Sequence, residues 1–561
     1  MPLKKLLLKS GVNRENTRYT SEGGWYECDK IRFRQGTPEK IGGWQRISAT
    51  TFQGVCRSLW NWVTLGSQNL IAVGTNLKYY IENGGAYNDI TPLRATVTLT
   101  NPFETVSGSP IVTVTDANGG YTDGDFVTYS GASAVGGLTL NGEYQITLTT
   151  TTNEYTIDAG SAASSAATGG GTVTAAYQIN VGTAFVIPLT GWGAGSWSSG
   201  TWGVGVTSTE SIRLWSESNF GEDLVFGPRG GPIYYWDATN GLASRGVALS
   251  TLGGASNVPT NQRLIEVSDI NRFVFAFGAN EFGSATVNPM LVRWSDQGSV
   301  VDWTPSVTSQ AGFLTLSNGT EIIAAKQARQ EVLVWTDAAL YSLQYVGAPV
   351  VWSAQLVGEN ISTASQNCVA YANGVAYWMG KDKFYKYDGR TQPLRCDLRK
   401  FIFGNFNEQQ YEQVFAGTNE SYHEIWWFYC STDQTNIDRY VVYNYLEDIW
   451  YYGTMARTAW LDSGLRGNPL AATYSYNLVN HEEGVDDNET ATTAAIHAYV
   501  ASAEFDLEDG HQFAFIWRIL PDIRFDGSTT GSPSATMTLL PLANSGSGYN
   551  DPLSEGGSNS R

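Results

Sequence analysis

The stretch "HEIWWFYCSTDQTNIDRYVVYNYLEDIWYYG", at residues 423–453, contains the pattern that decides the fold. Three short runs of apolar and aromatic residues are separated by segments rich in Asn and Asp. Runs of this composition favour β-strands, and Asn and Asp favour the turns between them. The stretch therefore predicts a small antiparallel sheet.

The same unit recurs along the chain. Copies with an apolar strand, a turn and an aromatic strand lie at residues 70–85, 211–237, 263–305, 331–347 and 368–390. Radially repeated sheets of this kind form a β-propeller, because each sheet buries its faces against its neighbours. A set of unrelated meanders is the alternative. We expect an all-β fold with a β-propeller of about six blades.

Length and composition agree with this class. A chain of 561 residues exceeds the size of a single hydrophobic core, so we expect two to four structural units. Aromatic residues make up 13% of the chain and there are 61 glycines, whereas charged residues make up only 16%, against about 25% in typical domains. This balance favours strands joined by glycine-rich turns.

One segment departs from the repeat. Over residues 95–178 the aromatic residues thin out and Thr, Ser, Ala and Gly replace them. Polar and apolar residues alternate at 111–115, and Asn141-Gly142 is a hairpin signal. We expect a small β-sandwich or barrel domain inserted into a loop of the first blade, since surface loops accept insertions at low cost.

These observations divide the chain into eight parts. They are a basic arm (1–50), the first propeller strands (51–94), the Thr/Gly-rich inserted domain (95–178), a Gly/Trp-rich loop (179–208), propeller blades (209–460), an acidic loop region (461–494), extra distal, closing or platform strands (495–545), and a flexible tail (546–561).

The Gly/Trp-rich loop contains Trp192, Trp197 and Trp202 at intervals of five residues. This spacing gives the three indoles no common face on a strand or on a helix. A sugar-binding platform would require a common face. We therefore expect a winding loop that places each indole in a separate crevice between blades or subunits.

Charge is distributed unevenly. The net charge is −19, yet residues 1–50 contain ten Lys and Arg against five Asp and Glu. The rest of the chain is therefore strongly acidic. Such a body repels nucleic acid phosphates, so it is not a surface that grips DNA, although DNA could pass along it without adhering.

Cysteine spacing and hydropathy restrict the compartment. The five cysteines form no CxxC pair, and we expect reduced thiols from folding in a cytoplasm. The apolar run at residues 6–8 is too short for a secretory signal, and no stretch approaches the roughly 18 apolar residues of a membrane span. We expect a soluble protein or a part of an assembly.

Motifs for catalysis are weak. The run at 374–382 lacks the spacing of a phosphate loop, and the run at 294–303 lacks the alternation of an Asp-box turn. With four histidines there is no HExxH or GxSxG motif. Residues 481–489 contain five carboxylates, which suit either a solvated acidic loop or calcium. Carboxylate pairs for glycoside cleavage stay open because their spacing is tertiary. We expect no enzyme, cofactor or metal site.

The N-terminal sequence "GVNRENTRYTSEGGWYECDKIRFRQGTPEKIGGW" resembles the start of the tail nozzle, or packaged-DNA stabilisation, proteins of short-tailed bacteriophages. Segments 214–237 and 292–305 resemble blade segments of the same family. The matching residues of the arm are Gly11, Asn16, Thr17, Gly23, Gly24, Trp25, Asp29, Lys30, Arg32, Arg34, Pro38, Lys40, Gly42, Gly43 and Trp44.

This resemblance implies a structural virion protein with a β-propeller. It implies a homohexamer at the distal end of a short tail, below an adaptor ring and beside tail fibres or spikes. The channel would retain packaged double-stranded DNA and conduct it during ejection. Assembly would take place in the host cytoplasm, and the tail would contact the host envelope.

The arm also supplies the candidate interface residues. Lys30, Arg32 and Arg34 alternate on one face of an expected strand, with Ile31 and Phe33 on the other. The basic face is either a contact with another subunit or the adaptor, or a solvated face within one subunit. The assembly-interface candidates are Trp25, Lys30, Arg32, Arg34, Trp44, Trp192, Trp197 and Trp202. The alternative function is a glycan-binding or glycan-cleaving β-propeller for receptor recognition, with aromatic residues stacked on sugar rings.

Overall fold

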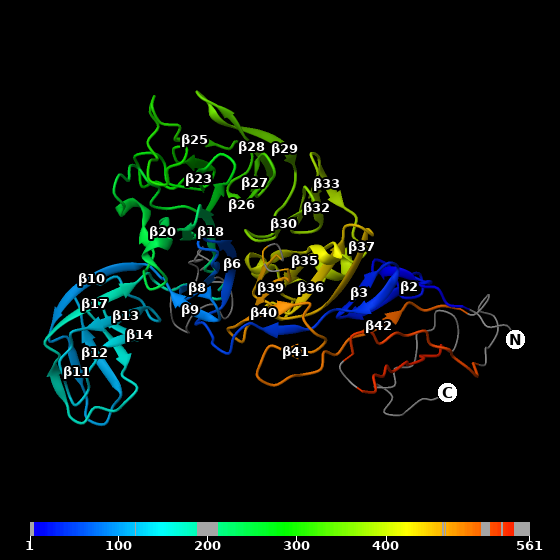
Figure 1. Ribbon diagram of the computed structural model, residues 1–561, viewed down its shortest axis with the longest axis horizontal. Helices are drawn as coiled ribbons and strands as arrows, with labels where there is room; N and C mark the ends of the chain where they lie inside the picture. Colours follow the sequence, from blue (N-terminus) through cyan, green and yellow to red (C-terminus); the bar gives the residue numbers. More distant parts are fainter. Residues whose placement is uncertain are drawn as a thin grey trace, which may run out of the picture.

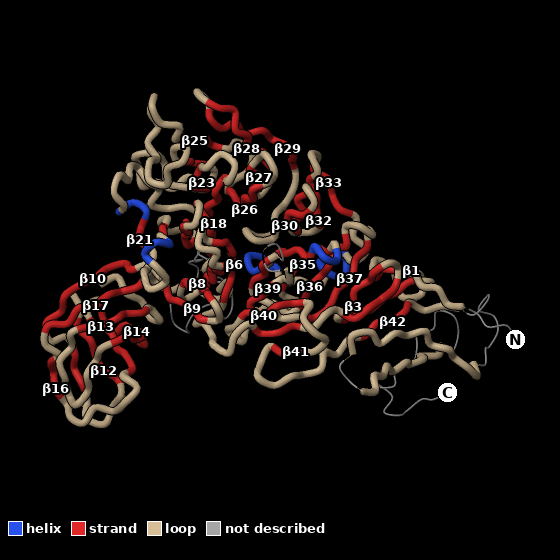
Figure 2. The backbone as a smooth tube through the Cα atoms, in the orientation of Figure 1, coloured by secondary structure: helices blue, strands red, loops and turns tan. Residues whose placement is uncertain are grey.

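The computed structural model describes residues 5–117, 119–187, 211–462, 465, 467–506, 516–528 and 531–542. Strands dominate this part of the chain (Figures 1 and 2), which confirms the predicted all-β class. None of the described helices has the length and apolar character to cross a membrane. The helices of the described residues are α1 (Arg399–Phe403), η1 (Ala238–Asn240), η2 (Leu249–Thr251), η3 (Glu408–Gln413) and η4 (Glu420–Tyr422).

Six antiparallel sheets are each built from four consecutive strands. The first three are β6 (Cys56–Val63), β7 (Asn69–Thr75), β8 (Tyr79–Asn83) and β9 (Ala86–Asp89); β18 (Trp215–Phe220), β19 (Asp223–Pro228), β20 (Tyr234–Trp236) and β21 (Val247–Ala248); and β22 (Leu264–Ser268), β23 (Phe273–Phe277), β24 (Leu291–Trp294) and β25 (Gly312–Thr315). The next three are β26 (Ile322–Gln327), β27 (Val332–Thr336), β28 (Ala339–Gly347) and β29 (Val351–Glu359); β30 (Val369–Ala372), β31 (Val375–Met379), β32 (Phe384–Tyr387) and β33 (Thr391–Leu394); and β34 (Phe415–Asn419), β35 (Glu424–Tyr429), β36 (Arg439–Asn444) and β37 (Ile449–Thr454).

A seventh sheet joins the two ends of the chain. Its strands β38 (Ala459–Leu461), β39 (Leu470–Ala472) and β40 (Leu478–His481) continue along the sequence, and β5 (Trp44–Arg46) pairs with β40 from the N-terminal side. The short strand β41 (Asp487–Asn488) runs parallel to β5 on its outer edge. The last blade is therefore shared between sequence segments more than 400 residues apart.

The seven sheets form a closed ring. The first strands contact one another in the order β6, β18, β22, β26, β30, β34, β38 and again β6. The fold is a seven-bladed β-propeller, where about six blades were expected. The seventh escaped prediction because its strands are only two to four residues long and lie in the arm, at the end of the expected blade range and in the expected acidic loop region.

Aromatic side chains fill the spaces between neighbouring blades. Tyr79 of the first blade stacks on Phe226 of the second with ring centroids 4.3 Å apart. Trp426 and Trp460 stack at 5.6 Å between the sixth and seventh blades. Such pairs add about 0.5–1.5 kcal/mol beyond the burial of their area. The five cysteines are free thiols buried in the structure.

The inserted domain lies between β9 and β18, and Figure 1 shows it at the lower left of the propeller. It follows the last strand of the first blade and therefore connects the first blade to the second. The expected insertion into a loop within the first blade is wrong. β14 pairs with both β13 and β15, which joins two small sheets around one core. The strands are β10 (Leu93–Thr100), β11 (Phe103–Thr105), β12 (Ile111–Thr115), β13 (Phe126–Ser130), β14 (Gly142–Thr151), β15 (Glu154–Asp158), β16 (Ala167–Gly169) and β17 (Thr172–Gln178).

The N-terminal arm packs on the outside of the sixth blade. Its strands β1, β2 and β3 contact β37, and β2 also pairs with β42 to form a small platform sheet. The expected second platform strand is not formed in its described part, residues 516–525. The elements are β1 (Lys9–Val12), β2 (Gly24–Asp29), β3 (Ile31–Arg34), β4 (Thr37–Lys40) and β42 (Tyr499–Ser502).

There is no room for a side chain at Gly43, which directly precedes β5. A Cβ atom there would lie 2.5 Å from the Asp486 carbonyl oxygen and 2.7 Å from the Asp486 nitrogen. We expect Gly43→Ala to destabilise the fold by about 1–3 kcal/mol, because backbone must move to relieve the overlap. Thermal unfolding measures this. Gly66→Ala is the matched control, since its nearest neighbouring atom would be 3.7 Å away. Equal melting temperatures for the two variants would contradict this account of the closure.

Candidate assembly site at the propeller closure

Arg32 of β3 fixes the arm to two blades at once. The side chain is 2% exposed, and its guanidinium donates to Glu424 at 2.8 and 3.0 Å and to Glu482 at 2.8 and 2.6 Å. Glu424 lies on β35 of the sixth blade, and Glu482 directly follows β40 of the seventh. Two bidentate pairs of this kind define one orientation of the arm.

Further groups complete the buried ion cluster. The Tyr451 hydroxyl and the Trp426 indole donate to Glu424. The Tyr422 ring lies 3.5 Å from the guanidinium carbon of Arg32. Burial raises the pKa of the Glu424 carboxyl above its ordinary value, although the Arg32 guanidinium opposes this shift. Arg32, Tyr451 and Trp426 therefore take the place of solvent around the Glu424 carboxyl.

A second cluster surrounds Trp44, the first residue of β5. Its indole donates to Asp487 at 2.7 Å, and the guanidinium carbon of Arg457 lies 4.9 Å from the centre of its ring. Arg457 also donates to the Nε2 atom of His481 at 2.9 Å and to Glu489 at 3.1 Å. Burial lowers the pKa of His481 well below its ordinary value, with the charge of Arg457 adding to this effect, so the ring is neutral.

The acidic run at 481–489 thus has a different role from either expected one. Glu482, Asp487 and Glu489 contact the arm or its neighbours, so the run is a part of the closure and not a loop surrounded by solvent. Among the described residues, no group of three or more His, Cys, Asp or Glu side chains is arranged to hold a metal ion.

The three basic residues of the arm have three different environments. Lys30 precedes β3 with a left-handed backbone and contacts Asp29 and Thr454. Arg32 is buried, and Arg34 is exposed. The expected common basic face is wrong, because β3 is covered by the sixth and seventh blades and Arg32 points between them. For Arg32 neither an external contact nor a solvated position applies.

Trp25 lies beside a groove on the arm. The groove has a volume of about 230 Å³ and includes Gly24, Asp397 and Trp450 in its lining. The indole ring packs 6.4 Å from the Phe33 ring, and its N–H has no hydrogen-bond acceptor within the described residues. The Trp25 indole N–H is therefore a buried donor without a partner among the described residues. Trp192, Trp197 and Trp202 lie outside the described residues.

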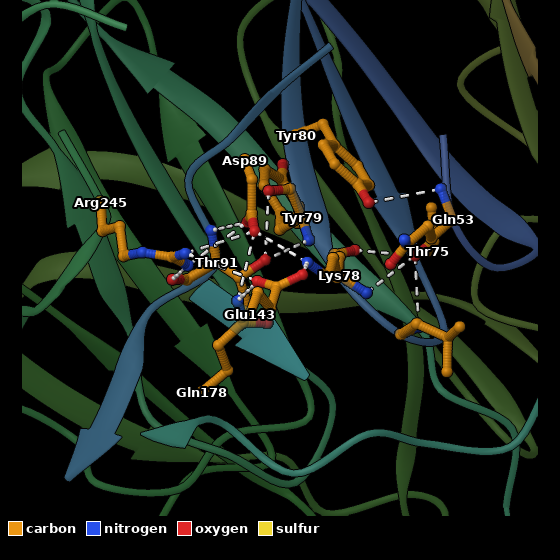
Figure 3. A network of polar contacts seen from close by, with 11 residues as sticks. Gln53, Thr75, Lys78, Tyr79, Tyr80, Asp89, Thr91, Glu143, Gln178 and Arg245 are labelled. Atoms are coloured by element: carbon orange, nitrogen blue, oxygen red, sulfur yellow. Dashed lines mark hydrogen bonds and ion pairs between the residues drawn. The ribbon is translucent and has the colours of Figure 1, made fainter. Parts of the chain in front are cut away.

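A third polar network fixes the inserted domain to the propeller (Figure 3). Lys78 of the first blade is buried and pairs with Asp89 at 3.0 Å and with Glu143 of the inserted domain. Gln178 donates to Glu143 at 2.7 Å, and Arg245 of the second blade donates to the Thr91 carbonyl at 2.7 Å and to Asp89. Three structural units share these contacts, so the domain has a fixed orientation.

Charges also modify the pKa of Asp89 in this network. Burial by itself would raise the pKa of this carboxyl, but the Lys78 ammonium and the Arg245 guanidinium lower it below its ordinary value. The Asp89 carboxyl therefore stays ionised to a lower pH than an unperturbed aspartate.

The innermost strands contain a small group of ionisable side chains. Glu217, Glu266 and Lys326 lie on the first strands of the second, third and fourth blades, and Asp462 follows β38. Burial raises the pKa of Glu217 to about 8 and that of Glu266 to about 7, while the Lys326 ammonium opposes both shifts. One Glu217 oxygen is buried without a hydrogen-bond partner. At neutral pH the Glu217 carboxyl is largely protonated.

Sequence reasoning identified the arm but not its partners. Glu424, Glu482, Asp487 and Glu489 complete the site, and no motif marks them. The one available signal is charge, because the acidic run at 481–489 complements the basic arm. Their pairing depends on ring closure, which has no signature in local sequence.

The geometry defines the class of this protein as a seven-bladed β-propeller closed by its own N-terminal arm. No family model matches the chain, and no curated protein matches it. Among solved structures, the AfRom2 CNH domain is 11% identical, with 52% of this chain and 84% of that chain covered and a TM-score of 0.30. Kluyveromyces lactis Hsv2 is 10% identical, with 53% and 83% covered and a TM-score of 0.30. The Cps50 (Swd1) β-propeller domain of Myceliophteria thermophila is 10% identical, with 49% and 85% covered and a TM-score of 0.29.

Removal of the Arg32 charge should open the closure. Arg32→Met leaves the buried Glu424 carboxyl without its partner, and we expect a loss of about 3–5 kcal/mol in the free energy of unfolding. Urea unfolding at pH 7 measures this loss. Arg34→Met on the same strand is the control, and we expect a change within about 0.5 kcal/mol because Arg34 is exposed. A similar stability for both variants would refute the role of Arg32.

Glu217 should make stability depend on pH. Its pKa is about 8 in the folded state and near 4.5 in the unfolded chain, so the unfolded chain loses a proton first as the pH rises. Wild-type stability should therefore fall between pH 5 and pH 8. We expect Glu217→Gln to become more stable relative to wild type over this interval in urea unfolding, and Glu104→Gln, at an exposed site, to follow wild type. Parallel curves for wild type and Glu217→Gln would show that Glu217 does not titrate in this way.

Proposed function

We propose that this chain is a structural virion protein, the tail nozzle of a short-tailed bacteriophage. Six copies form a channel at the distal end of the tail, retain packaged double-stranded DNA and conduct it during ejection, without a catalytic step. An adaptor ring lies above the channel, and fibres or spikes lie beside it. The observation that carries this proposal is the nozzle-like arm, whose matching residues have defined structural roles.

Glycines of the matching sequence support the proposal. A Cβ atom at Gly42 would lie 2.5 Å from a carboxylate oxygen of Glu482 and 2.7 Å from its Cα, and Gly43 is similarly close to Asp486. Only glycine fits at both positions without movement of the chain. The two glycines that match the nozzle-like sequence are therefore required by this fold.

Polar residues of the matching sequence support it too. The Asp29 carboxylate accepts hydrogen bonds from the Thr454 N–H at 2.7 Å and from its hydroxyl at 2.9 Å. Arg32 and Trp44 make the closure contacts described above. Each of these side chains has a specific partner on a blade, so a related sequence elsewhere would favour the same closure.

Charge and surface chemistry are consistent with a DNA conduit. Carboxylates outnumber basic groups by 19 over the whole chain, and fixed negative charge repels phosphates across a Debye length of about 8–10 Å. A duplex would pass such a wall without adhering. Trp25 lines a groove on the arm, and this groove supports a contact between the arm and a neighbouring subunit or the adaptor.

The mass and shape of the purified particle test the proposal. Six copies of 61.1 kDa give about 367 kDa, and we expect a ring with a central hole in negative stain, formed by the protein alone or with its adaptor. Native mass spectrometry measures the copy number. A compact monomer that binds or degrades bacterial polysaccharide would instead establish the glycan-directed alternative.

A further inference from the structure

A cavity of about 440 Å³ lies where the inserted domain meets the propeller. Cavities that hold small organic ligands have volumes of about 300–1,000 Å³, so this one has room for such a ligand. Three parts of the fold line it: the residues that precede β6 (Phe52 and Gln53), strands β13 and β14 of the inserted domain (Phe126 and Tyr144), and the hairpin between β39 and β40 (Tyr476).

The three parts that surround the cavity are fixed relative to one another. Lys78 of the first blade pairs with Glu143 of β14, as Figure 3 shows, and this contact holds the inserted domain against the propeller. The Phe52 N–H donates to the Tyr476 carbonyl at 3.0 Å, which joins the residues before β6 to the hairpin. The cavity is therefore a built part of the fold.

Tyr476 has a backbone conformation that is costly for a tyrosine. Its φ is +60°, in the left-handed region, where glycine and asparagine are favoured over bulky residues. The residue is 44% exposed, and its phenol makes no hydrogen bond or ring contact among the described residues. Strained positions of this kind cluster at binding sites. Contacts within the described chain give no reason for an aromatic ring at this position, whereas a ligand in the cavity would.

The unpaired hydrogen-bonding groups at the cavity are neutral. The Gln53 side-chain amide and the Tyr144 hydroxyl have no hydrogen-bond partner within the described residues. Glu143 is the one charged residue of the described lining, and Lys78 and Gln178 already bind its carboxylate. An ionic ligand would find no free counter-charge there. Aromatic rings beside neutral donors and acceptors match a neutral sugar, which has apolar C–H faces and many hydroxyl groups.

We propose that this cavity binds a neutral saccharide unit of a larger glycan. Tyr476 and Tyr144 supply the aromatic surfaces, and the Gln53 amide with the Tyr144 hydroxyl supplies the hydrogen bonds. The site binds without cleavage, because glycoside hydrolysis uses two carboxylates and the described lining has only the paired Glu143. The site lies within one chain, so it does not depend on the proposed arrangement of six copies.

Binding to a printed array of bacterial polysaccharides tests the site. We expect the wild-type chain to bind neutral members of the array, and Tyr476→Asn to weaken this binding at least tenfold. Asparagine is favourable in the left-handed region, so this variant should unfold at the wild-type temperature or above it. Tyr499→Asn is the matched control and should bind as wild type does, because Tyr499 is equally exposed at 44% but lies on the platform sheet.

Two further variants remove single hydrogen-bonding groups. Tyr144→Phe keeps the ring and loses the hydroxyl, and Gln53→Ala loses the amide at an exposed position. Each should weaken binding about three- to tenfold, the cost of one hydrogen bond. Polysaccharide incubated with the wild-type chain should release no reducing ends.

Three results would overturn the saccharide site: no neutral polysaccharide bound by wild type, binding unchanged in Tyr476→Asn, or binding restricted to anionic polysaccharides and lost at high salt. Release of reducing ends would overturn binding without cleavage. Native mass spectrometry of the same samples separates the site from the proposed function. A ring that binds no neutral polysaccharide leaves the nozzle proposal intact, whereas a monomer that binds one through Tyr476 supports the site and contradicts the nozzle.

Discussion

The pairing of β5 with β40 is the constraint on which the rest of the structure depends. A ring of sheets has no stable partial form comparable to its closed one, because every blade relies on a neighbour on each side. Here the last neighbour is supplied by residues from opposite ends of the described chain. The Arg32 cluster then holds this pairing in place, through one guanidinium shared between the sixth and seventh blades.

The closure also organises the outer parts of the molecule. Once β5 is in place, the arm must run along β37, and this course places β2 where β42 can pair with it. On the opposite flank, Lys78 and Arg245 fix the inserted domain at the junction of the first two blades. The propeller therefore has two fixed attachments on different flanks of one ring, the inserted domain and the platform sheet formed by the arm and β42.

The sequence predicted the repeated blades but not the seventh blade, in which β5 pairs with β40. Blades with strands of five or more residues, such as β35 to β37, are visible because aromatic and β-branched runs alternate with turns. Strands β38 to β40 are too short to produce that signal, and β5 is a blade strand only because of its tertiary partner. The partners of Arg32 are equally hidden, since Glu424 and Glu482 lie 392 and 450 positions away. Trp25 and Trp44 were both predicted to lie at an assembly interface, but their environments differ. Trp44 is buried by the closure, whereas Trp25 lies beside a groove.

The separation of Arg32 from Glu482 has a consequence during synthesis. A ribosome that adds about 5–20 residues per second needs roughly 20–90 s to travel the 450 positions between them. Throughout that interval the nascent arm has an unpaired strand edge and an uncompensated guanidinium. Its lysines and arginines keep it hydrated and discourage association with other nascent edges. The basic charge of the arm thus limits association with other chains before closure. Once the seventh blade has emerged, the Arg32 charge pairs with Glu424 and Glu482 and holds the arm in place.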